Sequence, residues 1–140
     1  MHRLGAGAAV VVAAASLLTA CSAARNGLGT TDESCYLALP TAAKAVGGQG
    51  HTHLAGVRKY SLGGLRSVAP RLYGRLAPHV PKGQSVCLAA YTGHFAASGV
   101  SDPFGRRSGT LAVVVVTTPA NHVLGTLILT KLPVRFQHMF

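Results

Sequence analysis

The sequence predicts a single α+β domain, with a small antiparallel sheet of about four strands and two short helices packed on one face. Three observations predict this fold class. After residue 34, segments with helical and strand-like patterns follow the order helix, strand, helix, strand, strand, strand, and the last three are expected to pair antiparallel. In addition, 49% of the residues are hydrophobic, a composition that favours a folded core over disorder.

The first helix is predicted over residues 35–46, where it would end at Gly47 and Gly48. Pro40 either interrupts this helix or lies in the first turn of a helix that begins near Leu39. The spacing of its apolar residues predicts a buried face. That face would consist of Leu39, Ala42, Ala43 and Val46.

A second helix is predicted over residues 67–77, with Pro70 near its first turn. Its apolar residues recur at helical spacing, whereas two glycines and the proline argue against one longer helix. Arg71 and Arg75 are four residues apart and would share a face of it.

Four strands are predicted, and the last two form a hairpin. The segment 110–118 contains four consecutive valines and is the most strand-like in the chain. The segment 85–95 is apolar on both faces, which is typical of an interior strand. The segment 96–108 is predicted as a loop, and 131–140 as an extended tail covering a sheet edge. The four strands span 52–60, 85–95, 110–118 and 123–130.

The amino-terminal segment has the pattern of a secretory signal peptide. Arg3 gives it a positive start, residues 4–20 carry no charge, and a small residue precedes Cys21. The residues Leu-Thr-Ala-Cys at 18–21 resemble the lipobox of bacterial lipoproteins. This resemblance implies cleavage after residue 20, a diacylglycerol on Cys21, and anchoring to the outer face of the bacterial cell membrane. An uncleaved membrane span, or an ordinary signal peptide with an incidental cysteine, are the alternatives.

Residues 21–34 are small, polar and aperiodic, and are therefore predicted to form a flexible tether between the lipidated cysteine and the domain of residues 35–140. If Cys21 carries lipid, Cys35 and Cys87 remain as an even pair in an oxidising compartment. A disulfide between them is the simplest expectation. A redox-active or metal-binding pair is the alternative, although neither cysteine belongs to a Cys-x-x-Cys motif.

The chain is strongly basic, with 13 Lys and Arg residues against 3 Asp and Glu residues. Export argues against a nucleic-acid partner, so anionic lipid or an anionic wall polymer is the expected partner. The alternative is that the charge only keeps the domain soluble. A candidate basic patch lies within eighteen residues and comprises Arg58, Lys59, Arg66, Arg71 and Arg75.

The scarcity of acids disfavours several classes of enzyme. After the tether, Asp102 is the one remaining acid, whereas paired-carboxylate glycosidases need two acids and calcium or magnesium sites need several oxygen ligands. Neither a Gly-x-Ser-x-Gly elbow nor a phosphate-binding glycine loop occurs. We therefore expect no catalytic residues and no cofactor, and a small envelope hydrolase that recruits Asp102 is a remote alternative.

His51 and His53 form a weak candidate metal site, because histidines two apart on a strand point the same way. His94 or His122 would supply a third ligand, and solvated histidines are the simpler interpretation. Taken together, the sequence predicts an exported, lipid-anchored, non-enzymatic domain that binds a partner or supports an envelope assembly. A lipoprotein that binds a metal or small ligand through these histidines is the runner-up.

Overall fold

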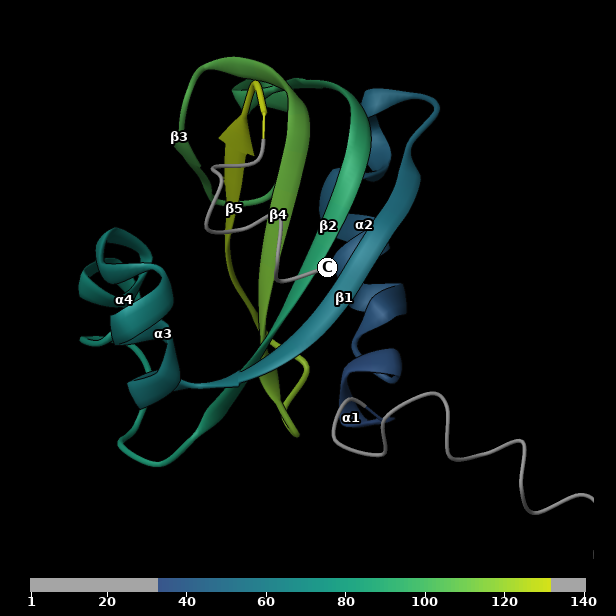
Figure 1. The fold of residues 1–140 in the computed structure, drawn as a ribbon. Helices are drawn as coiled ribbons and strands as arrows, with labels where there is room; N and C mark the ends of the chain where they lie inside the picture. Colours follow the sequence, from purple (N-terminus) through teal and green to yellow (C-terminus); the bar gives the residue numbers. More distant parts are fainter. Residues whose placement is uncertain (1–32, 132–140) are drawn as a thin grey trace, which may run out of the picture.

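The computed structural model describes residues 33–131. The signal peptide predicted over 1–20, Cys21 with nearly all of its tether, and the tail over 132–140 lie outside the described residues. The described part is an α+β domain, as predicted, and it contains a five-stranded sheet rather than one of about four strands (Figure 1).

The sheet has the strand order β1-β2-β4-β5-β3. All neighbouring strands are antiparallel except β3, which pairs with β5 in parallel at the edge. The four predicted strands are confirmed, and β3 lies inside the segment predicted as a loop, because three residues are too few to show a periodic pattern. The strands are β1 (His53–Ser61), β2 (Ser85–Ala96), β3 (Pro103–Gly105), β4 (Ser108–Thr118) and β5 (Val123–Leu129).

Residues 33–131 also form four α-helices and two 3₁₀ helices, three of which precede the first strand. The helix α2 begins at Leu39 with Pro40 in its first turn, which confirms one of the two predicted alternatives. The second predicted helix is instead two short helices that meet at Ala69, because a proline disfavours helical geometry in the residue before it. The elements are α1 (Glu33–Tyr36), α2 (Leu39–Val46), η3 (Gly47–Gln49), α3 (Leu62–Val68), α4 (Pro70–Leu76) and η4 (Ala97–Gly99).

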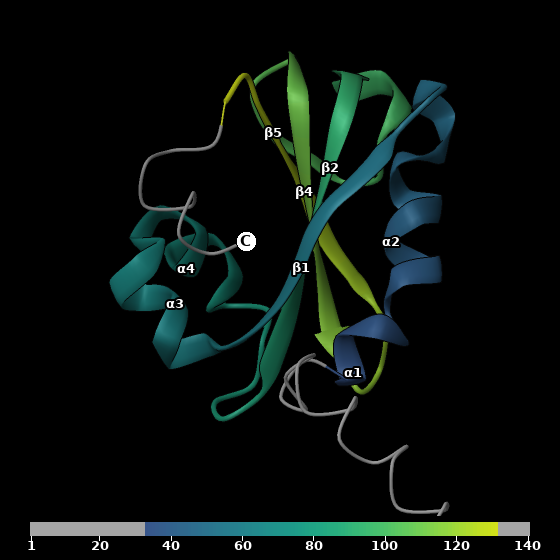
Figure 2. The same cartoon turned by 45° about the vertical axis from the view of Figure 1, so that its right-hand side comes forward.

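The helices cover both faces of the sheet, whereas the sequence predicted both on one face. Figure 2 shows α1 and α2 on one side of the strands and α3 and α4 on the other. Along β2, Val86 and Leu88 pack in the core beneath α3 and α4, while Cys87 and Ala89 pack in the core beneath α2. Since both faces of this strand are apolar, each face needs its own cover.

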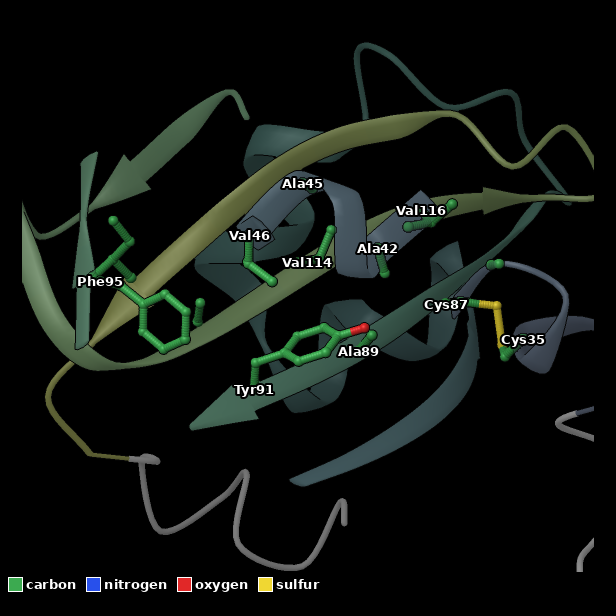
Figure 3. Packing of buried hydrophobic residues seen from close by; sticks show 13 residues of the cluster. Cys35, Ala42, Ala45, Val46, Cys87, Ala89, Tyr91, Phe95, Val114 and Val116 are labelled. Carbon is green, nitrogen blue, oxygen red and sulfur yellow. A yellow bond between two sulfur atoms is a disulfide. The ribbon is translucent and has the colours of Figure 1, made fainter. Parts of the chain in front are cut away.

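Small side chains bring α2 close to the sheet (Figure 3). Ala42, Ala45 and Val46 are buried against the strands, and Ala43, predicted to be buried, is exposed instead. Tyr91 lies in the same core, and burial raises the pKa of its phenol because the phenolate would lose its hydration. The central residues of this face are thus buried beneath α2.

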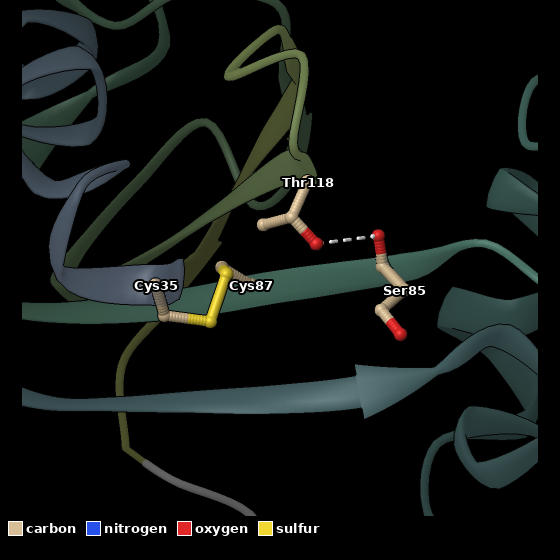
Figure 4. Close-up of a disulfide and its surroundings, with 4 residues drawn as sticks. All are labelled: Cys35, Ser85, Cys87 and Thr118. Atoms are coloured by element: carbon tan, nitrogen blue, oxygen red, sulfur yellow. Dashed lines mark hydrogen bonds between the residues drawn. A yellow bond between two sulfur atoms is a disulfide. The ribbon is translucent and has the colours of Figure 1, made fainter. Parts of the chain in front are cut away.

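A disulfide joins α1 to the second strand, as the sequence predicts. Cys35 and Cys87 are bonded, with 5.4 Å between their Cα atoms and a sequence separation of 52. Near the bond, the Thr118 hydroxyl donates a hydrogen bond of 3.3 Å to the Ser85 carbonyl oxygen of β2 (Figure 4). The disulfide thus fixes the start of the described domain to an interior strand of its sheet.

We expect the Cys35→Ser, Cys87→Ser double variant to lose about 4 kcal/mol of unfolding free energy, the chain-entropy estimate for a loop of this length. Urea denaturation with and without reductant measures the loss. The Cys21→Ser variant is the matched control and should unfold like the unaltered chain. A denaturation midpoint that reductant leaves unchanged would contradict the structural role of the bond.

Candidate functional site

A pocket of about 520 Å³ opens between the α3–α4 pair and the β5–β3 edge of the sheet. Its apolar walls include Leu72 on α4, Phe104 on β3, and Leu127 and Leu129 on β5. Its volume lies within the range usual for small-molecule sites. The pocket is therefore a candidate site for a ligand with an apolar part.

The pocket exists because α3 and α4 do not cover the outer part of their face of the sheet. Leu127 and Leu129 pair in register with Val113 and Leu111 of β4 and so share their face. Both β5 leucines are only partly buried, as is Phe104. Ile128, which points to the α2 face between them, is fully buried. One face of β5 is thus closed, and the other is left as an apolar floor.

Two arginines stand at the rim of this pocket. Arg71 and Arg75 are both exposed, lie one helical turn apart on α4, and line the pocket. The guanidinium carbon of Arg75 lies 4.8 Å from the centre of the Phe104 ring, within the range of a cation–π contact. This contact ties α4 to the edge strand and holds one positive charge over the pocket.

The five basic residues predicted as a patch do not form a single surface. Arg58 opposes Leu88 in register and shares the face covered by α3 and α4, whereas Lys59 opposes Cys87 and faces the α2 side. Arg66, on α3, lies with its guanidinium carbon 6.0 Å from the centre of the Tyr73 ring. The four arginines therefore lie on one side of the sheet, and Arg71 and Arg75 alone line the pocket. Phe104 and the β5 leucines were missed, since nothing in their spacing links them to α4.

The structure separates His122 from the other candidate metal ligands, whereas His94 lies two residues beyond Thr92, the partner of His53. His53 opposes Thr92 at the amino end of β1. His122 is hydrogen-bonded through its backbone to Thr117, which lies level with the other end of β1. His51 and His53 are exposed, and residues 33–131 contain no group of three or more His, Cys, Asp or Glu side chains placed to hold a metal.

A second pocket, of about 540 Å³, gathers His79, Asp102 and His122. Two imidazoles and one carboxylate are groups used in acid–base chemistry. The hydroxyl that lines this pocket belongs to Thr117, and it is engaged with the backbone of His122: the His122 amide donates to it at 3.2 Å, and it donates to the carbonyl oxygen at 3.4 Å. No serine or cysteine lines the pocket, so it offers no free nucleophile to complete a triad.

Comparison with protein-family models, with curated proteins and with solved structures finds no match for this chain. Within residues 33–131, no helix has the length and apolar character needed to span a bilayer. The site is accordingly interpreted from its own geometry.

We expect Gly125→Ala to displace Phe104 and destabilise the domain by about 1–3 kcal/mol, the usual cost of overpacking. Gly125 has a φ of +152°, and a Cβ there would lie 2.8 Å from Cε1 of Phe104. Gly74→Ala is the matched control, since a Cβ at this position of α4 meets nothing within 4 Å and alanine favours helix. Thermal unfolding of both variants tests this. Equal melting temperatures for Gly125→Ala and Gly74→Ala would show that Phe104 can move aside without loss of stability, which would contradict the prediction.

Proposed function

We propose that this chain is an exported lipoprotein, held by an acylated Cys21 at the outer face of a bacterial cell membrane, whose domain binds a partner rather than catalysing a reaction. The observation that carries the proposal is the Leu-Thr-Ala-Cys motif at residues 18–21, at the end of the uncharged run of residues 4–20. Two or more acyl chains on one cysteine suffice for stable attachment of a domain to a bilayer.

The chemistry of the described domain supports a binding role. Residues 33–131 contain two acids, Glu33 and Asp102. Asp102 lies with two histidines in a pocket whose one hydroxyl is already hydrogen-bonded. The pocket beneath Arg71 and Arg75, by contrast, joins apolar walls to positive charge, a combination suited to holding a ligand.

The four arginines on the α3–α4 side favour an anionic partner, and for an exported, anchored domain we propose the anionic lipid surface. Basic side chains near such a surface contribute about 1 kcal/mol each. The runner-up, a small-ligand-binding lipoprotein, is favoured by the pocket on α4 rather than by His51 and His53.

We expect Cys21→Ser to abolish acylation, because the thiol that would carry the lipid is removed. Intact-mass analysis of the membrane-extracted unaltered chain should show cleavage before residue 21 and added acyl mass, and the Cys21→Ser chain should carry no acyl mass. The Cys35→Ser, Cys87→Ser variant is the control and should keep the acyl mass. For the unaltered chain, an unprocessed mass that begins at Met1 would overturn the proposal.

We expect the unlipidated Cys21→Ser chain to sediment with anionic vesicles at low salt and to be released near 0.5 M salt, where the Debye length is about 4–5 Å. Adding Arg66→Gln should weaken this binding about fivefold, the equivalent of about 1 kcal/mol. Lys44→Gln, on α2 across the sheet, removes the same charge and should weaken the binding to anionic vesicles less than Arg66→Gln does. Equal binding to neutral vesicles would count against an anionic partner.

A further inference from the structure

We propose that the pocket between α4 and the β3–β5 edge binds a single-chain anionic amphiphile, such as a fatty-acid carboxylate. The anionic head would pair with Arg71 and Arg75, and the hydrocarbon chain would lie on Leu72, Leu127 and Leu129. This inference deepens the binding role proposed above and rests on that role, but it does not depend on the lipid at Cys21.

The apolar half of the site requires a hydrocarbon ligand. Leu127, Leu129 and Phe104 form a partly buried floor on a face whose neighbouring residues on β4 are fully covered. Removing such surface from water contributes about 25 cal/mol for each Å² covered. Because the floor runs along β5 and ends under α4, an elongated chain covers it better than a compact polar molecule.

The charged half of the site requires an anion. No carboxylate in residues 33–131 lines this pocket, so neither guanidinium is neutralised there. Guanidinium groups bind carboxylate and phosphate oxygens through paired hydrogen bonds. The Phe104 ring already orients Arg75, which reduces the side-chain entropy lost when an anionic head binds.

Charge also decides between this ligand and the chain's own carboxyl-terminal segment. Residues 132–140 follow shortly after Leu129 and include several apolar side chains, but they carry Arg135 and no Asp or Glu side chain. A second copy of the chain is likewise strongly basic, with a formal net charge of +10 for the full sequence. The charged side chains of both occupants are net positive, whereas an anionic amphiphile complements two arginines.

Isothermal titration of the purified Cys21→Ser chain with dodecanoate, below its critical micelle concentration, tests the proposal. We expect one dodecanoate per chain, with affinity reduced about tenfold or more in the Arg71→Gln, Arg75→Gln variant. Lys44→Gln, Lys82→Gln removes the same charge outside the pocket and should change the affinity less than threefold. Dodecyltrimethylammonium, which has the same chain and the opposite charge, should bind at least tenfold more weakly than dodecanoate.

Absence of dodecanoate binding, equal binding of the cationic amphiphile, or equal losses in the two double variants would each overturn the proposal. The comparison of dodecanoate with dodecyltrimethylammonium needs no variant. It therefore stays decisive even if an arginine substitution unfolds the chain. Dodecanoate binding only after truncation behind Lys131 would also overturn it, by identifying residues 132–140 as the occupant. Failure here would leave the acyl mass on Cys21 unaffected, so the anchor and the pocket are tested separately.

Discussion

The architecture depends on two central strands that are apolar on both faces. In β4, every residue from Leu111 to Thr118 is buried, and β2 alternates its side chains between two separate cores. A strand of this kind cannot leave either face in water. The short helices therefore divide between the two sides, and α3 and α4 together do not cover all of theirs. The pocket at β5 is the part of this apolar face that no helix within residues 33–131 covers.

The elements that follow from local pattern were predictable. The four longer strands, the start of α2 at Leu39 and the pairing of Cys35 with Cys87 each rest on periodicity, capping or the number of cysteines. The parallel edge strand β3 was not predictable, because its partner residues lie 23 positions further along the chain and its three residues show no period. The helix α2 lies on one face of the sheet, and α3 and α4 lie on the other. This placement depends on how the connections between elements cross the sheet, which the periodicity of the sequence does not encode.

The candidate site was only half visible in the sequence. Arg71 and Arg75 share a helix face by their spacing alone, but their companion Phe104 comes from the edge strand and is brought beneath Arg75 by the tertiary fold. Lys59 was grouped with Arg58 because the two are adjacent, yet neighbours on a strand point to opposite faces. With few acids in the domain, the arginines on the α3–α4 side keep charges that are available to a partner.

The disulfide also sets the route of mechanical load through the domain. A pull applied upstream of Cys35 enters the sheet at Cys87, because the covalent bond bypasses the residues between them. The helices α2, α3 and α4 and the strand β1 all lie within that closed loop and cannot be drawn out. The force passes instead to β2 and its ladder with β4, the longest in the sheet. A domain tethered at its amino-terminal end would thus bear tension on its most extensively hydrogen-bonded pair of strands.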